Sequence, residues 1–222
     1  MDQHADVAVL SGGGIPRSAS VRELVSLRTG SYRVEPPLRS VLREATQDVH
    51  DRLHRHAGFA AIKDASIGMV AYQEIIVRLY GFYVPFEAAA AMRPDRSQWL
   101  ADDMSALGLK RSLHALPLCQ DVPCLANAHR RLGALYVAEG SALGGRDLAR
   151  GLDSLLGKNV MMGRQFFTGR GARTGEAWGI YLAQLSAAPP DPSVRLEIIN
   201  GAVETFAAFE NWLSGWSTSL DG

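Results

Sequence analysis

The chain has 222 residues, of which 47% are hydrophobic and 21% are charged. This composition is typical of a globular protein and argues against a disordered, collagenous or coiled-coil chain. Its 23 basic residues balance 23 acidic ones, so the formal net charge is zero. Proteins that bind nucleic acid or an anionic membrane through bulk charge normally carry a basic excess, so the sequence predicts neither partner.

The sequence also predicts a cytoplasmic protein. No apolar stretch approaches the roughly 20 residues of a membrane-spanning helix. The N-terminus lacks the positive segment of a signal peptide, and its apolar run Val7–Leu10 is too short for one. Cys119 and Cys124 lie five residues apart, which matches neither a zinc ribbon nor a redox Cys-x-x-Cys pair, so reduced thiols are expected.

Residues 1–36 differ in composition from the rest of the chain. They contain the run Gly12–Gly14 and scattered serine and arginine, and they end at a pair of prolines, Pro36 and Pro37. Their weak apolar periodicity predicts a flexible N-terminal arm. The three glycines lack the Lys-Ser/Thr that follows in a phosphate-binding loop, so a nucleotide site is not expected.

From Leu38 onward, apolar residues recur at helical spacing and predict a single all-α domain over residues 37–217. The first stripe runs from Leu38 to Leu53. A second helix is predicted over Met69–Ala91, where Pro85 is expected to kink or break it. No pair of strands is indicated. Further helices are predicted over Arg96–Ala106, Cys124–Gly157, Glu176–Ala187 and Ser193–Trp216, with a loop over Gly163–Gly175.

Arg43 and His50 are the first candidate site residues. They lie seven residues apart on the first predicted helix, so their side chains share a face at a separation of about 10 Å. A histidine beside an apolar stripe can bind a metal, and a cation two turns away can bind a carboxylate. This spacing suits a flat ligand with a central metal and acidic side arms, such as haem. A solvated helix with an incidental histidine is the alternative.

A glycine-rich segment inside the Cys124–Gly157 helix is the second candidate. Tyr136, Gly140 and Gly144 follow at intervals of four and lie on one face. A glycine inside a helix costs roughly 1 kcal/mol relative to alanine, so several together require a reason. Their missing side chains allow close approach of a flat ligand to the backbone, or close packing of a second helix.

Together these segments resemble the haem oxygenases. The bacterial branch of that family has a first-helix motif and a glycine-rich distal helix of this kind. The resemblance covers about residues 38–213 and rests on four motifs in the family's order, namely Leu42–His50, Leu79–Glu87, Tyr136–Gly145 and Thr205–Leu213.

The resemblance implies a role for each candidate. His50 is implied as the proximal iron ligand, Arg43 and Tyr136 as partners of the haem propionates, and Gly140 and Gly144 as contacts of the distal haem face. Ser141 is implied to lie beside the oxygen-binding position. It stands where the mammalian-type pattern has an aspartate that organises distal water, so other groups must form the water network here.

The resemblance also implies the reaction and its partners. Haem is both substrate and cofactor, and it is cleaved to biliverdin, carbon monoxide and ferrous iron with O2 and electrons from a ferredoxin or a reductase. A phytochrome-type photoreceptor is one expected recipient of biliverdin. Three arginines of the predicted loop are further candidate cations for the propionates, namely Arg164, Arg170 and Arg173.

Two alternatives stay open at this point. His54 shares the face of His50 and is its rival as iron ligand. A haem-binding, haem-trafficking or sensor protein with little turnover is the second reading of the function. Asp51-x-x-His54 has the spacing of half a di-iron site, but the other histidines supply no second half. His50 and the distal glycines argue against a third reading, a helical enzyme of similar architecture that acts on another small molecule without haem.

Overall fold

The computed structural model describes residues 36–109 and 112–214, and every regular element in these ranges is a helix. This confirms the predicted all-α class. The predicted arm lies outside the described residues, apart from Pro36. The helices are α2 (Leu38–His54), α3 (Ala57–Lys63), α4 (Met69–Ala89), α5 (Asp95–Ala106), η1 (Leu113–Ala115), α6 (Ala128–Gly151), α7 (Asp153–Leu156), α8 (Gln165–Thr168), η2 (Gly171–Arg173), α9 (Thr174–Ser186) and α10 (Pro192–Ser214).

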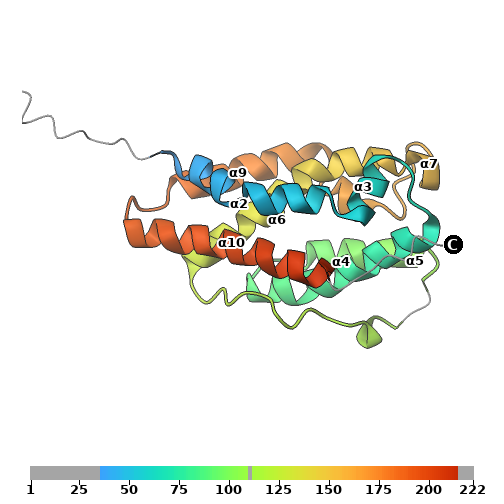
Figure 1. Cartoon of the computed structure of the whole chain (residues 1–222), viewed down its shortest axis with the longest axis horizontal. Helices are drawn as coiled ribbons and strands as arrows, with labels where there is room; N and C mark the ends of the chain where they lie inside the picture. The colour runs from blue at the N-terminus through green and yellow to red at the C-terminus, as the bar shows by residue number, and fades with distance from the viewer. Residues whose placement is uncertain (1–35, 110–111, 215–222) are drawn as a thin grey trace, which may run out of the picture. The chain divides into compact units, whose positions relative to one another are not determined.

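Helix α6 packs against α3, α8, α9 and α10 (Figure 1). It contributes to two hydrophobic clusters. One contains Val137 of α6 with Leu42 of α2 and Ile198 of α10, the last two fully buried. The other contains Ala138 of α6 with buried residues of α3, α4 and α8. Helix α2 itself rests on α3, α9 and α10. Both clusters therefore fix the position of α6, and the cluster around Leu42 also fixes α2.

Several predicted boundaries need correction. The long predicted helix over Cys124–Gly157 begins only at Ala128, because the Asn127 side chain caps the helix by accepting a hydrogen bond from the Arg130 N–H. It ends at Gly151 and is followed by the separate α7. The expected loop over Gly163–Gly175 contains α8 and η2, and the short α3 was not predicted. Helices of one or two turns carry too few residues for a periodic signal.

Pro85 was expected to kink or break this helix, and the structure contradicts the break, because α4 continues through Pro85. A proline inside a helix leaves the carbonyl four residues earlier without its donor. Here the carbonyl of Gly81 accepts a hydrogen bond from the Cys119 N–H at 2.9 Å. The absence of a side chain at Gly81 makes this possible, since a Cβ there would lie 2.5 Å from the carbonyl oxygen of Pro117. A distant segment thus replaces the bond that Pro85 removes.

A buried carboxylate holds the short helix α8 in place. Asp103 of α5 accepts hydrogen bonds from the backbone N–H groups of Gln165 and Phe166, at 2.7 and 2.9 Å. These donors at the start of α8 have no partner within their own helix. Burial raises the pKa of Asp103 to about 6, against the opposing effect of the two hydrogen bonds. The ionised carboxylate is therefore tolerated here at some loss of stability.

Asp103 predicts a specific pH dependence of stability. Because its pKa in the folded protein is raised, the folded state binds the proton more tightly than the unfolded state between about pH 4 and 6. Its contribution to the free energy of unfolding is fully present below this range and is lost as the pH rises through about 6. We expect urea denaturation of wild type and Asp103→Asn at pH 4.5, 5.5 and 7 to show the wild type losing about 2 kcal/mol relative to the variant between the first and the last pH. Parallel pH profiles would contradict this assignment.

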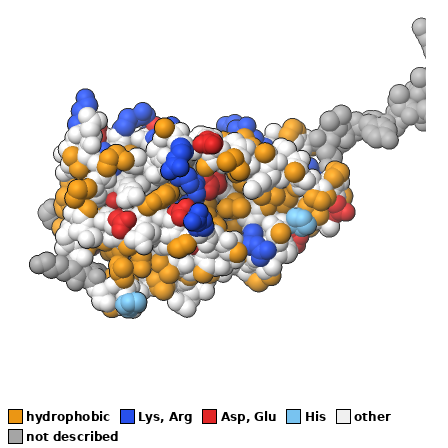
Figure 2. All heavy atoms as spheres, turned by 180° about the vertical axis from the view of Figure 1, so that it is seen from behind, with side chains coloured by type: hydrophobic (Ala, Val, Ile, Leu, Met, Phe, Trp, Pro, Cys, Tyr) orange, Lys and Arg blue, Asp and Glu red, His pale blue; other side chains and the backbone are white. Residues whose placement is uncertain are grey.

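The surface carries charges of both signs. On the face shown in Figure 2, basic and acidic side chains lie next to one another between apolar ones. Ion pairs join some of these charges in the described residues, as between Arg130 and both Glu197 and Glu204.

No helix in the described ranges is long and apolar enough to cross a membrane. Cys119, which is buried, and Cys124, which is exposed, are both free thiols.

Candidate functional site

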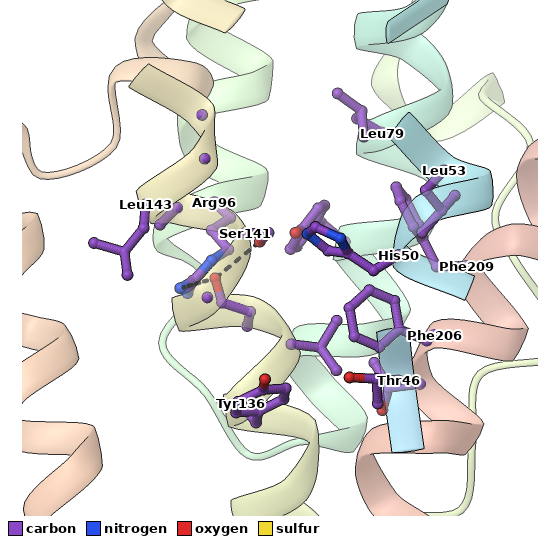
Figure 3. Close-up of a pocket in the computed structure, with 18 of the residues that line it drawn as sticks. Thr46, His50, Leu53, Leu79, Arg96, Tyr136, Ser141, Leu143, Phe206 and Phe209 are labelled. Atoms are coloured by element: carbon purple, nitrogen blue, oxygen red, sulfur yellow. Dashed lines mark hydrogen bonds between the residues drawn. The ribbon is translucent and has the colours of Figure 1, made fainter. Parts of the chain in front are cut away.

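A cavity of about 450 Å³ lies between α2 and α6 (Figure 3). Its size is within the usual range of small-molecule and cofactor sites, and such sites are mostly apolar with a few polar groups. Helices α3, α4, α5, α8, α9 and α10 complete its walls. The apolar lining includes Leu53, Leu79, Phe82, Phe86, Phe166, Phe206 and Phe209.

All six predicted site residues line this one cavity. Arg43 and His50 come from α2, and four others come from α6 on the opposite side. The four are Tyr136, Gly140, Ser141 and Gly144. Figure 3 shows His50 projecting from α2 into the space that faces Ser141. Two segments about 90 positions apart in the chain therefore form the two faces of a single site.

The imidazole of His50 is accessible from the cavity. Its side chain is 52% exposed, and its ring meets that of Phe206 edge to face at 6.4 Å between centroids. Its Nε2 lies 3.2 Å from Nε2 of His54, and its Nδ1 lies 3.7 Å from Oδ1 of Asp51. Burial, followed by the nearby His50, lowers the pKa of His54 below its ordinary value. Both histidines are placed to offer a ring nitrogen to a ligand in the cavity.

The glycines of α6 fall into two groups. A Cβ added at Gly133 would lie 1.9 Å from the carbonyl oxygen of Ile198, so this glycine is required for the packing of α10. A Cβ at Gly145 would likewise lie 2.7 Å from the carbonyl oxygen of Phe167. At Gly144 it would meet no described residue within 4 Å.

Gly140 belongs with Gly144, since a Cβ there would reach only the ring of Trp178, at an ordinary 3.8 Å. Helix packing therefore explains Gly133 and Gly145 but does not explain the two glycines that face the cavity. Each of the two lowers the stability of α6 by roughly 1 kcal/mol relative to alanine. Their arrangement suits a ligand that lies directly on the backbone of α6.

A buried ion pair that the sequence analysis missed lies behind this face. Arg96 of α5 is only 3% exposed, and its Nη2 donates to Glu139 Oε1 at 2.9 Å and to the carbonyl of Ala138 at 3.2 Å. The Ser141 hydroxyl donates to the same carbonyl at 3.0 Å. Arg170 donates to the other oxygen of Glu139 at 2.9 Å. Arg96 also lines the cavity, so a cation stands beside the position of Ser141.

Arg96 is held in this position by a carboxylate of a different helix. Glu87 of α4 accepts hydrogen bonds from the backbone N–H groups of Arg96 and Ser97, at 2.9 and 3.1 Å, and so caps the start of α5. Tyr83, one turn earlier on α4, lines the cavity, and burial raises its pKa, so the phenol stays protonated and can donate. No local motif marks Arg96, because its partners are distant in sequence.

One end of the cavity carries two arginines. Arg39 and Arg43 lie one turn apart on α2, and both line the cavity. The guanidinium carbon of Arg39 lies 5.9 Å from the ring centroid of Trp178, within range of a cation–π contact. Tyr136 lies beside the same tryptophan, at 5.9 Å between centroids. The sequence analysis missed Arg39, although its spacing of four from Arg43 was a usable signal.

The arginines of the predicted loop lie elsewhere. Arg164 is buried, and it pairs with Asp153 and donates to the carbonyls of Ala149 and Gly157, which fixes the end of α6 to α7. Arg170 is engaged by Glu139. Neither these two nor Arg173 is among the described residues that line the cavity. Arg39, which lines the cavity, is therefore the additional candidate for binding the ligand's acidic arms, in place of these three arginines.

The residues present fit haem better than a protein-built metal centre. In the part of the chain that the structure describes, no group of three or more His, Cys, Asp or Glu side chains is arranged around one metal position, so the di-iron alternative lacks its ligands. Haem brings its own ring nitrogens and needs one protein ligand. The cavity offers an accessible histidine on one face, bare backbone on the other, and two arginines for carboxylate arms.

Comparison with known proteins agrees with this assignment. The sequence matches the family model described as "Heme oxygenase" over residues 37–215. Haem oxygenase-1 from the cyanobacterium Synechocystis sp. PCC6803, solved in complex with haem, superposes with a TM-score of 0.66 at 16% identity, over 83% of this chain and 94% of its own. Haem oxygenase from Leptospira interrogans superposes with a TM-score of 0.68 at 17% identity, over 82% of this chain and 100% of its own. No curated protein matches the sequence. Because the family model covers most of the chain, the protein belongs to the haem oxygenase family, a family of oxidoreductases.

Proposed function

We propose that this protein is a haem oxygenase, which binds haem in the cavity and cleaves it to biliverdin, carbon monoxide and ferrous iron. The observation that carries the proposal is the pairing of an accessible histidine on α2 with two unfilled glycine positions on α6, across one cavity. The proposal assigns His50 as iron ligand and makes O2 and an external electron donor the other reactants. When bound, haem supplies the iron at which O2 is reduced and the ring that is cleaved.

The side chains on α2 bind and orient the haem in this proposal. The imidazole of His50 would hold the haem iron and would leave that iron free to react with O2. Arg39 and Arg43 bind the two carboxylate arms, which fixes the rotation of the ring in its own plane. Tyr136 adds a hydroxyl at the same end. Rotation matters because it decides which bridging carbon of the ring faces the reactive position.

The side chains and backbone on the opposite face shape the oxygen position. Gly140 and Gly144 would let the backbone of α6 lie directly against the ring, which would leave room on that face only for a small ligand such as O2. The apolar walls exclude bulk water. The Ser141 hydroxyl, the Tyr83 phenol and the Arg96 guanidinium can hold ordered water through which a proton moves, in place of the acid that stands at the Ser141 position in the mammalian-type pattern.

The proposal extends to partners and location. The electrons come from a ferredoxin or a reductase, and biliverdin is available to a phytochrome-type photoreceptor. A cytoplasmic location fits both partners and agrees with two free thiols, since disulfides are rare in that compartment.

Hemin titration followed by reduction in air tests the proposed function. We expect a saturable one-to-one Soret band that decays into a biliverdin spectrum, with carbon monoxide trapped by ferrous myoglobin, when a ferredoxin system is added. A Soret band that persists under reduction would instead identify a haem carrier or sensor. Absence of saturable haem binding would leave only the fold in common with the family.

Charge reversal at the arginine end is expected to weaken haem binding. Arg43→Glu places a carboxylate beside the carboxylate arms, and we expect hemin affinity to fall about tenfold, roughly 1.4 kcal/mol. The Soret position of the residual complex should stay that of histidine ligation, because His50 is two turns away. Arg55→Glu is the matched control, since Arg55 is exposed at the end of α2 and lies outside the cavity lining. A spectral change without a loss of affinity would contradict carboxylate pairing.

A further inference from the structure

His50 and His54 form a pair of imidazoles on one face of α2. They lie at positions i and i+4, both line the cavity, and their Nε2 atoms are 3.2 Å apart. Their ring centroids are 4.4 Å apart at an interplanar angle of 64°. The two nitrogens that a histidine most often offers to a metal are therefore the two nitrogens that face each other.

This separation matches chelation of one metal ion. A zinc–imidazole bond is about 2.0–2.1 Å long, so two nitrogens 3.2 Å apart subtend about 100° at a shared ion. That angle lies between the octahedral and the tetrahedral value. Two histidines at i and i+4 on one helix face can bind a single zinc ion. Both side chains are exposed, so water has room to complete the coordination sphere.

The neighbouring residues favour the required tautomer of His50. Asp51 Oδ1 lies 3.7 Å from His50 Nδ1 and is itself held by a hydrogen bond from Gln47 Nε2 at 2.8 Å. A carboxylate on this side attracts the proton to Nδ1 and leaves the lone pair on Nε2. Carboxylates that accept a hydrogen bond from the other ring nitrogen commonly orient metal-binding histidines, and Asp51, at 3.7 Å, acts on His50 through its charge alone.

We propose that the haem-free protein binds one divalent transition-metal ion between Nε2 of His50 and Nε2 of His54. Imidazole ligands suit zinc, copper, nickel and iron(II), so the site takes ions of this class. His50 has one Nε2 lone pair, so the ion and haem iron exclude each other. Ions of this class thus compete with haem for the protein. The ferrous iron released by turnover is such an ion, a consequence that rests on the proposed function.

Zinc titration of the tag-free, haem-free protein tests the site. We expect isothermal calorimetry with zinc chloride to give a one-to-one isotherm. The affinity should fall at least tenfold in His50→Gln and in His54→Gln. His114→Gln is the matched control, because His114 is exposed in η1 and lies outside the cavity lining. Protein saturated with haem should no longer bind zinc at this site.

The outcomes separate this proposal from the proposed function. An unchanged far-ultraviolet dichroism spectrum shows that His54→Gln is folded, so a loss of zinc binding there belongs to the site. Zinc affinity unchanged in His54→Gln, zinc binding that persists after haem saturation, or no saturable zinc binding would each overturn the proposal. None of these readouts requires bilin formation, so a protein that binds haem without turnover leaves the zinc test intact.

Discussion

Replacement of His50 by alanine is expected to reduce bilin formation at least about 100-fold. The variant loses the side chain to which the proposed function assigns the haem iron, so bound haem would lack its fixed position in the cavity. The side chain of His50 is 52% exposed, and its removal leaves no buried group unpaired. Helicity and the free energy of unfolding should therefore stay within about 0.5 kcal/mol of the wild type. Single-turnover bilin absorbance measures the loss of bilin formation, and far-ultraviolet dichroism measures the helicity.

His54→Ala is the matched control, since it removes the rival histidine from the same face of the same helix. It should keep bilin formation within a few-fold of the wild type and keep the Soret band of histidine ligation. Added imidazole should restore part of the band in His50→Ala, because the deleted ring leaves room for it. If His54→Ala abolished turnover while His50→Ala did not, the ligand assignment would pass to His54.

The sequence predicted α2 and its candidate residues well because the signal there is local. Apolar residues recur along one face of this helix, and side chains seven positions apart must share a face whatever the rest of the chain does. Arg43 and His50 therefore line the cavity together. Arg39 obeys the same rule and was within reach of the same argument.

Residues whose role depends on distant partners were beyond such reasoning. Arg96 looks like a solvent-exposed cation near the start of a helix, and only the fold shows it buried against Glu139. The prediction for Arg164 failed in the opposite direction. Its place in a glycine-rich segment suggested a contact with the ligand, but in the fold it is bound by backbone carbonyls and by Asp153. The continuity of α4 through Pro85 could not be predicted for the same reason, because the Cys119 N–H that satisfies the Gly81 carbonyl is 38 positions further along the chain.

The α6 glycines show most clearly what sequence spacing cannot separate. Gly133, Gly140, Gly144 and Gly145 all interrupt one helical pattern, and nothing in that pattern distinguishes those required by a neighbouring helix from those that face a ligand. The distinction depends on what an added Cβ would meet, which is a property of the folded chain. Substitution at these positions separates stability from function.

Gly144→Leu and Gly133→Ala are expected to have opposite effects. At Gly144 no described residue lies within 4 Å of an added Cβ, and leucine favours a helix more than glycine by nearly 1 kcal/mol. The haem-free variant should therefore be as stable as the wild type or more stable by up to about 1 kcal/mol. The leucine side chain would extend into the cavity where the ring is proposed to lie, so hemin affinity and bilin formation should each fall at least tenfold.

At Gly133 the smaller substitution has the larger structural effect. An alanine Cβ 1.9 Å from the Ile198 carbonyl oxygen and 2.8 Å from the Ala202 nitrogen forces α6 and α10 apart, because both contacts are backbone and cannot rotate away. Overpacking of this kind typically destabilises a protein by 1–3 kcal/mol, and a backbone clash should lie at or above the upper end. Urea denaturation of the haem-free proteins would measure the change in stability of each variant, and hemin titration would measure the change in hemin affinity. A stable Gly144→Leu that binds hemin normally would remove the α6 backbone from the haem site, even if His50 kept its role.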